Sequence, residues 1–300
     1  MNTPSPCEEQ EMDYLYFPGC TLYTKAKNLD QTARDCSLLL GFELKEIENW
    51  TCCGATFPLA KDNVMAFLPP ARILANAREK GTALTTLCAV CFNVIKRTNR
   101  LIREDNDKRD KINNFLEKNY QGDLRIVHYL EILKKDVGFV HLKERLKKPL
   151  TNLRAAAYYG CMLLRPFGEM EFDDKERPTL FEEFLESLGA TAVHFPLKIE
   201  CCGSFQSVGA PEVATECAYR ILGSAIKNGA ELLVSTCPMC TFNIDHKQED
   251  IKAKYLGFKE VPVFYFTQLL GIAMGLDPQR LGFERNAVNP LPLLKEKGLL

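Results

Sequence analysis

The sequence predicts an α/β protein built from two tandem repeats related by a pseudo-twofold axis. Two observations carry this prediction: ten of the thirteen cysteines fall into two matching sets, and short apolar segments alternate with helical ones. Such alternation favours an open sheet of parallel strands with flanking helices. The 300 residues also suit two units better than one. We therefore expect an N-terminal domain over residues 1–150 and a C-terminal domain over residues 151–300.

The cysteine spacing is the clearest sign of duplication. Each half carries a single cysteine, then an adjacent pair followed by glycine, then a Cys-x-x-Cys motif, with 34 residues between pair and motif in both halves. The two sets are Cys20, Cys52, Cys53, Cys88 and Cys91, and Cys161, Cys201, Cys202, Cys237 and Cys240. The flanking sequences also repeat, since LYFPGC matches AAYYGC. Internal duplication explains both features.

Short apolar or aromatic segments in the first half are expected to form four strands: residues 13–17, 43–50, 82–87 and 125–129. Residues 29–42 have helical periodicity with a stop at Gly41. A helical region should follow the first cysteine pair, interrupted at Pro69 and Pro70. Residues 96–124 are rich in charge and are expected to be a solvated, helical insertion.

The second half repeats this order. Its expected strands are residues 154–160, 190–196, 231–236 and 261–266. Its expected helices are residues 177–189, 211–229 and 267–275. Each half then forms a small Rossmann-like parallel sheet, and every cysteine segment follows a strand. Because such positions gather at the carboxyl edge of the sheet, five distant thiols should converge in each half.

Composition excludes several classes of function. A net charge of −1 argues against a nucleic-acid-binding surface. No apolar run is long enough to span a bilayer, and the polar, acidic N-terminal segment is unlike a signal peptide. We therefore expect a cytoplasmic protein that does not span a membrane. In that reducing compartment, clustered cysteines favour metal or redox chemistry over structural disulfides.

Five thiolates in each half exceed what a simple metal site needs. A tetrahedral zinc site and a cubane [4Fe–4S] cluster each take four ligands. Thiolate-rich sites select zinc or iron–sulfur groups. The residues favour iron–sulfur binding, with zinc and thiol–disulfide chemistry as the alternatives.

At this point the motifs resemble a known family. The repeated cysteine pattern, the YFPGC opening and the asparagines Asn93 and Asn243 are similar to those of tandem CCG-domain proteins, above all the B subunits of CoB–CoM heterodisulfide reductases. The resemblance implies two noncubane [4Fe–4S] clusters, one held by each set of five cysteines. It also implies two partner proteins, a ferredoxin-like C subunit with two cubane clusters plus an FAD-containing A subunit. This chain has no nucleotide-binding glycine motif, so we expect it to bind neither nucleotide nor flavin.

The resemblance implies reductive cleavage of a small-molecule disulfide to two thiols, or the reverse reaction. Breaking a disulfide takes two electrons, which two clusters could deliver one each. Two alternatives stay open. One is a CCG-type electron-transfer subunit of a dehydrogenase or quinone-linked complex. The other is a non-catalytic adaptor stabilised by metal.

A few further residues have competing interpretations. His128 aligns with Tyr265 at a strand-to-helix edge and could donate a proton to product thiolates, although a structural histidine is the alternative. Arg165 and Lys198 lie close in sequence to cysteines and could neutralise an anionic substrate, or else be exposed charges. Two cysteines outside the repeated sets are expected to be small core hydrophobes: Cys36 and Cys217.

Overall fold

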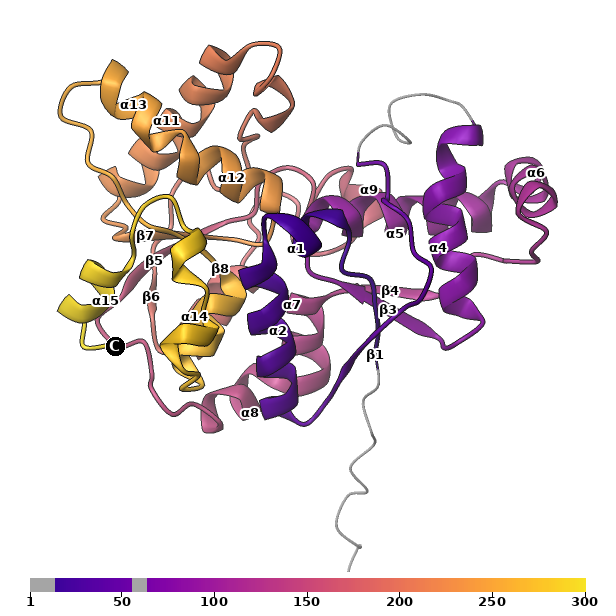
Figure 1. Ribbon diagram of the computed structural model, residues 1–300, viewed down its shortest axis with the longest axis horizontal. Helices are drawn as coiled ribbons and strands as arrows, with labels where there is room; N and C mark the ends of the chain where they lie inside the picture. Colours follow the sequence, from indigo (N-terminus) through magenta and orange to yellow (C-terminus); the bar gives the residue numbers. More distant parts are fainter. Residues whose placement is uncertain (1–13, 56–63) are drawn as a thin grey trace, which may run out of the picture.

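The computed structural model describes residues 14–55 and 64–300 and contains two four-stranded sheets in which all strands run parallel (Figure 1). The first sheet has the order β2-β1-β3-β4, with strands β1 (Tyr14–Tyr16), β2 (Leu44–Glu46), β3 (Ala83–Thr86) and β4 (Arg125–His128). The second has the order β6-β5-β7-β8, with strands β5 (Arg154–Tyr158), β6 (Thr191–Ala192), β7 (Leu232–Ser235) and β8 (Val263–Tyr265). The identical strand order confirms the duplicated α/β architecture.

The helices of the first half follow the expected order. They are α1 (Cys20–Thr24), α2 (Lys27–Leu40), η1 (Val64–Phe67), α4 (Leu68–Arg78), α5 (Ala89–Glu104), α6 (Asn106–Leu116), α7 (Tyr129–Glu131), η2 (Ile132–Gly138) and α8 (Phe139–Glu144). Gly41 ends α2 in the left-handed conformation, with a φ of 89°. Pro69 and Pro70 occupy the first turn of α4, where proline is tolerated because no N–H is needed, and the helical region changes there from the 3₁₀ helix η1 to an α-helix. Asp13 and residues 56–63, which open the first expected strand and helical region, lie outside the described residues.

The second half contains a similar series of helices. They are α9 (Phe167–Met170), α10 (Leu180–Ser187), η3 (Ser204–Gln206), α11 (Pro211–Lys227), α12 (Pro238–His246), α13 (Gln248–Lys254), α14 (Phe266–Ala273), η4 (Pro278–Arg280), η5 (Phe283–Arg285) and α15 (Leu291–Glu296). The strands are shorter than the sequence suggests. The expected strand at residues 190–196 pairs only through Thr191 and Ala192, with Arg154 and Ala155, although β5 itself continues to Tyr158.

The charged insertion at residues 96–124 has two parts. Helix α6 is largely solvated, with Ile112 as its buried residue, as expected. Helix α5 instead contacts the other half of the molecule. The Lys96 ammonium donates to the carbonyl of Met170, and Arg97 forms an ion pair of 2.7 Å with Glu169. The insertion therefore helps to join the two halves.

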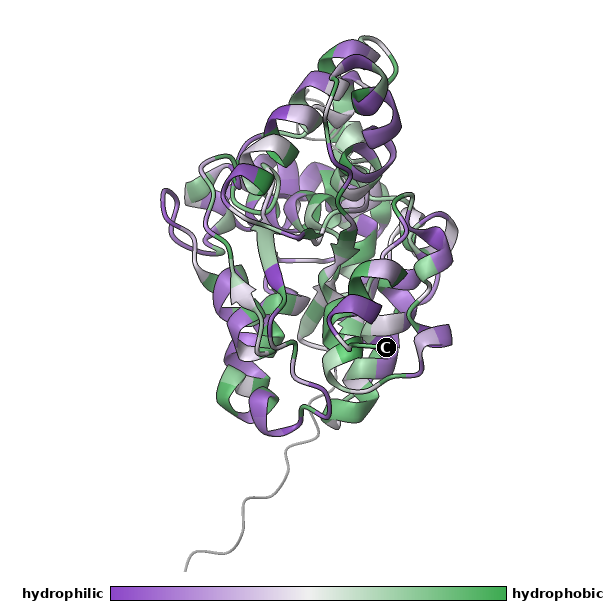
Figure 2. Cartoon of the chain, turned by 90° about the vertical axis from the view of Figure 1, so that its left-hand side faces the viewer, coloured by the Kyte–Doolittle hydropathy of each residue, from purple (hydrophilic) through white to green (hydrophobic). Residues whose placement is uncertain are grey.

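One continuous hydrophobic core extends over both halves. Helix α2 of the first half packs against α14 of the second (Figure 1), where the Thr32 and Thr267 hydroxyls lie 2.6 Å apart. Figure 2 shows hydrophobic residues along the inner strands and hydrophilic ones on the outer helices. Within residues 14–55 and 64–300, no helix is both long and apolar enough to cross a membrane. A domain boundary near residue 150 stays a prediction, because this core continues across it.

Candidate functional site

The cysteine segments follow the carboxyl ends of neighbouring parallel strands. In the first half, Cys20 opens α1 just after β1, the pair follows β2, and Cys88 is the N-cap residue of α5 after β3. Cys237 is likewise the N-cap residue of α12 after β7. Strands that are parallel and adjacent end on one edge of the sheet, so the fold gathers the thiols there.

The first set of thiols forms contacting pairs. The Sγ atoms of Cys52 and Cys20 lie 3.7 Å apart, and those of Cys53 and Cys91 lie 3.5 Å apart. Cys20 and Cys52 are exposed, whereas the other three members of the set are buried. The backbone N–H of Gly54 points at the Cys52 sulfur, with an N–S distance of 3.4 Å. The first set is therefore open to solvent at Cys20 and Cys52 and buried at its other three cysteines.

The second set repeats the arrangement. The Sγ atoms of Cys202 and Cys240 lie 3.4 Å apart, and Cys161 contacts Cys201. The backbone N–H of Gly203 donates to the Cys201 sulfur at 3.4 Å, as Gly54 does to Cys52 in the first half. The adjacent pair is therefore held by the same backbone contact in both halves.

The two sets meet at the centre of the molecule. The buried thiols of Cys88 and Cys237 lie close enough for each to shift the pKa of the other, although they are 149 positions apart in the sequence. Hydrogen bonds from Cys240 and then Cys88 hold the pKa of Cys237 well below its usual range. The pKa of Cys88 is raised because its partner is the stabilised thiolate. Each CxxC motif thus contributes its first cysteine to one shared junction.

Within each adjacent pair, one sulfur is stabilised as a thiolate. Hydrogen bonds from Cys52 and then Cys91 lower the pKa of Cys53 to about 4. In the second half the stabilised member is Cys201, whose pKa is lowered by Cys161 and then Cys202. The thiolate is the metal-binding form of cysteine, and the other member of each pair has a raised pKa, so each pair favours one thiolate.

Glycines leave room for the thiols to converge. A Cβ atom on Gly19 would lie only 2.8 Å from the Cys91 sulfur, and one on Gly160 would lie 3.2 Å from the Cys240 sulfur. Both glycines have positive φ, at 76° and 65°. Among the described residues, no group of three His, Cys, Asp or Glu side chains is arranged to hold a single metal ion. Five soft thiol donors in each half fit an iron–sulfur group in their chemistry.

The asparagines after the CxxC motifs have different partners. Asn93, on α5, donates to the carbonyls of Met162 and Arg165 in the other half, each at 2.7 Å. Asn243, on α12, donates to the carbonyl of Cys202 in its own half and accepts from Ser207 at 3.1 Å. Asn93 therefore positions the loop that follows Cys161, whereas Asn243 positions the pair in its own site.

Both ring nitrogens of His128 contact backbone groups. Its Nδ1 accepts from the N–H of Leu130 at 3.2 Å, and its Nε2 lies 3.0 Å from the carbonyl of Leu87. Burial lowers the pKa of His128 to about 3, so the ring is neutral near pH 7. The geometry favours the structural interpretation over the proton-donor hypothesis.

The expectations for Lys198 and Cys217 also change. Lys198 forms a 2.5 Å ion pair with the buried Glu182 and donates to the carbonyl of Pro178, so it is not free to neutralise a substrate. Cys36 is buried in the core, as expected, but Cys217 is partly exposed. The Cys217 sulfur lies against Gly203 of the second pair. Sequence spacing could not indicate either contact, because both depend on how helices pack.

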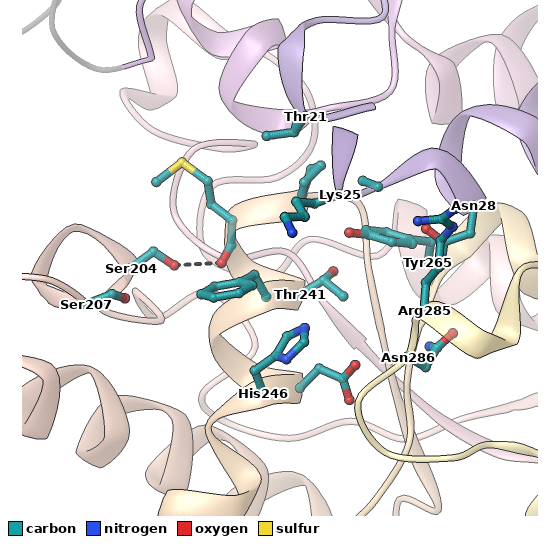
Figure 3. A pocket seen from close by; sticks show the side chains of 15 residues that line it. Thr21, Lys25, Asn28, Ser204, Ser207, Thr241, His246, Tyr265, Arg285 and Asn286 are labelled. Carbon is teal, nitrogen blue, oxygen red and sulfur yellow. Dashed lines mark hydrogen bonds between the residues drawn. The ribbon is translucent and has the colours of Figure 1, made fainter. Parts of the chain in front are cut away.

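A cavity of about 240 Å³ is lined by residues of both halves, although no cysteine is among them (Figure 3). Thr21, next to Cys20, lines one side, and Pro238, next to Cys237, lines another. Its polar lining includes five residues that the cysteine pattern did not indicate as cavity residues: Lys25, Asn28, Thr241, Tyr265 and Arg285. A signal existed for Thr241, which directly follows Cys240, but the others come together only in the folded chain.

Known proteins show the same pattern. A family model described as the cysteine-rich CCG domain matches residues 14–96 and 155–245. The chain is 33% identical over 286 residues to the 8-methylmenaquinol:fumarate reductase membrane anchor subunit of Wolinella succinogenes, covering 94% of this chain and 99% of that protein. It is 28% identical to the B subunit of the ferredoxin:CoB-CoM heterodisulfide reductase of Methanosarcina mazei, covering 93% and 94%.

A solved structure supports the fold. The crystal structure of a hypothetical protein from Helicobacter pylori superposes with a TM-score of 0.73 at 15% identity and covers 92% of this chain. This chain spans about half, 51%, of that longer one. At this level of identity the similarity concerns the fold alone.

Proposed function

The chain belongs to the cysteine-rich CCG domain family, and from that premise we propose that it is the catalytic iron–sulfur subunit of a heterodisulfide-reductase-type complex. It would reductively cleave a small-molecule disulfide to two thiols. Two noncubane [4Fe–4S] clusters would serve it, one in each half. Its partners would be one ferredoxin-like protein and one flavin-containing protein, and the complex would work in the cytoplasm.

One observation carries the proposal: two sets of five thiols approach each other through Cys88 and Cys237. The first cluster would be held by Cys20, Cys52, Cys53, Cys88 and Cys91. The second would be held by Cys161, Cys201, Cys202, Cys237 and Cys240. When bound, the clusters would supply electrons one at a time.

The overall reaction needs two electrons and two protons, which convert R–S–S–R′ into RSH and R′SH. Two electron-supplying sites in one chain would match that requirement. The chain itself would bind and orient the disulfide in the cavity, between Thr21 and Pro238, so that it reaches both sites. The glycines Gly19 and Gly160 would keep space for the inorganic groups.

Metal analysis tests this function most directly. We expect the anaerobically purified protein to contain about eight irons and about eight sulfides per chain, as for two [4Fe–4S] clusters. Adding a disulfide substrate should change the electron paramagnetic resonance spectrum. Zinc without iron would contradict the proposal and support a metal-stabilised adaptor instead.

The similarity to the Wolinella protein favours a second function. That relative is named as part of a menaquinol:fumarate reductase, so this chain could pass electrons between a quinone and a dehydrogenase. The assembled complex distinguishes the two. Reduction of a disulfide by reduced viologen supports the first function. Oxidation of a menaquinol with no disulfide turnover supports the second.

A further inference from the structure

A serine hydroxyl contacts the cysteine pair of the second half. The Oγ atom of Ser204, at the start of η3, lies 2.9 Å from the sulfur of Cys202 and donates to the carbonyl of Met239 at 2.8 Å (Figure 3). Ser204 therefore bridges the adjacent pair and the CxxC motif of one site. A cysteine sulfur that binds a metal has lost its proton and can only accept, so the hydroxyl then becomes the donor in the contact with Cys202. Its one hydrogen is shared between two acceptors.

The matching position of the first half has no hydroxyl. Ala55 directly follows Gly54, as Ser204 directly follows Gly203. Ala55 also has a left-handed backbone, with a φ of 50°. Among residues 14–55 and 64–300, no side-chain hydroxyl is hydrogen-bonded to a sulfur of the first set. In the part of the chain that the structure describes, the hydroxyl contact is therefore a feature of the second site.

The residues before the two CxxC motifs differ in the same way. Thr236 directly precedes Cys237, whereas Leu87 directly precedes Cys88, and both side chains are fully buried. The Oγ1 atom of Thr236 has no hydrogen-bond partner within the described residues. An unpaired buried hydroxyl is costly, and the sulfur of a bound iron–sulfur group would be an acceptor for it. This observation is independent of Ser204 and again distinguishes the second site.

A third matched position also carries a hydroxyl in the second half alone. Phe17 and Tyr158 each lie three positions before the first cysteine of their set, and both are buried. The Tyr158 hydroxyl donates to the carbonyl of Glu200 at 2.6 Å, immediately before the adjacent pair. At three matched positions, the second half thus has a hydroxyl where the first half has an apolar side chain.

Hydroxyl groups next to the thiols affect how readily a site accepts an electron. The reduction potential of an iron–sulfur cluster depends on hydrogen bonds to its sulfurs and on exposure to solvent. Reduction adds negative charge, so a donor directed at sulfur stabilises the reduced state more than the oxidised state. Water reaches the first set at Cys20 and Cys52, whereas Cys201 is the one exposed member of the second set. In the second site, hydroxyls can supply the donors that water supplies in the first.

We propose that the hydroxyls of Ser204 and Thr236 raise the reduction potential of the second site and so keep both sites reducible by the same electron donor. Ser204 acts through Cys202 and is a positioning residue rather than a catalytic one. The inference rests on the proposed function only for an iron–sulfur group in each half. Both candidate functions pass electrons through these sites, so the inference applies to either.

Redox potentiometry followed by electron paramagnetic resonance tests this on the anaerobic, cluster-loaded chain. The Cys53→Ala variant, which should keep only the second group, identifies the signal of that group. We expect Ser204→Ala to keep its iron and to lower the ratio of reduced to oxidised second site about tenfold at a fixed potential, a shift of about 59 mV for one electron. Thr236→Val should lower it about threefold. Ser204→Thr keeps a hydroxyl and should stay close to wild type.

Thr98→Val is the matched control. The Thr98 hydroxyl is also buried and without a partner among the described residues, but it lies on α5 about two turns beyond Cys91. This variant should leave both potentials unchanged. An unchanged second potential in Ser204→Ala, an equal shift in the first site, or loss of iron from that variant would each overturn the inference. The expected shift in a chain that reduces no disulfide would keep the inference and reject the proposed function.

Discussion

The two sets of thiols have the same spacing and the same place in the fold, but different surroundings. Two cysteines of the first set are exposed, Cys20 and Cys52, whereas only Cys201 of the second set is. The asparagine after the first CxxC motif supports the other half, and the one after the second supports its own. Duplication has therefore kept the sulfur donors while the supporting contacts have diverged. The two sites are not interchangeable, because each depends on a different part of the chain.

The largest expected effect separates the two sites by their metal content. Cys53→Ala and Cys202→Ala should each remove about four of about eight irons, because each deletes a donor from one set only. Iron and sulfide analysis of the anaerobic variants measures this. Cys36→Ala, which changes a core cysteine outside both sets, should keep all the iron. Full iron content in either of the first two variants would contradict the ligand assignment.

The asparagines test whether the halves depend on each other. Asn93→Ala leaves the carbonyls of Met162 and Arg165 without their donor, so it should lower the free energy of unfolding by about 3–4 kcal/mol. It should also disturb the second site in electron paramagnetic resonance spectra, although Asn93 belongs to the first half.

Asn243→Ala is the matched variant and should disturb only the second site. Urea unfolding of both proteins gives the stability change. If Asn93→Ala altered the first site alone, the contact between the halves would have no role in positioning Cys161.

The glycines before the first cysteines should differ in their tolerance of a methyl group. Gly19 has φ 76° and ψ 165°, a conformation that other residues rarely adopt, and its Cβ would lie closer to sulfur than that of Gly160. We expect Gly19→Ala to lower the free energy of unfolding by about 2–3 kcal/mol and Gly160→Ala by about 1–2 kcal/mol. Denaturant titration measures both losses. A larger loss for Gly160→Ala than for Gly19→Ala would show that the second site has less room for a methyl group.

The smallest effect concerns pH and the aligned pair His128 and Tyr265. The pKa of His128 is lowered to about 3, so below its unfolded value of about 6.5 protons bind the unfolded chain preferentially. The free energy of unfolding is therefore unaffected by this histidine above about pH 6.5. Below that pH it falls by about 1.4 kcal/mol per pH unit as the pH drops towards 3. Tyr265 makes no such contribution, since burial raises the pKa of its phenol.

His128→Asn keeps a side chain that can cap the helix and removes the titrating group. The difference in unfolding free energy between wild type and variant, measured at pH 6.5 and 5.0, isolates the histidine. Equal pH dependence in the two proteins would mean that the ring is accessible to protons in the folded state.

Much of the fold could be predicted from the alternation of apolar and helical segments in the sequence. The eight strands among the described residues all lie within segments expected to be strands, because short apolar segments alternating with helical ones are recognisable locally. Strand length was overestimated at residues 43–50, where pairing stops at the end of β1, and at residues 190–196, where the chain leaves β5 before that strand ends. Lys198 was misjudged because its partner, Glu182, lies on a helix 16 residues away.

The sequence by itself determined the duplicated parallel sheets and the convergence of each set of five thiols on one sheet edge. Both follow from local pattern and from the geometry of parallel strands, which needs no knowledge of distant contacts. Only the tertiary structure decided that Cys88 meets Cys237, that Asn93 supports the opposite half, and that Lys25 and Asn28 line a cavity with Arg285. These depend on how α2, α5 and α12 pack across the shared core, and packing between distant helices is not encoded in the spacing of any one segment.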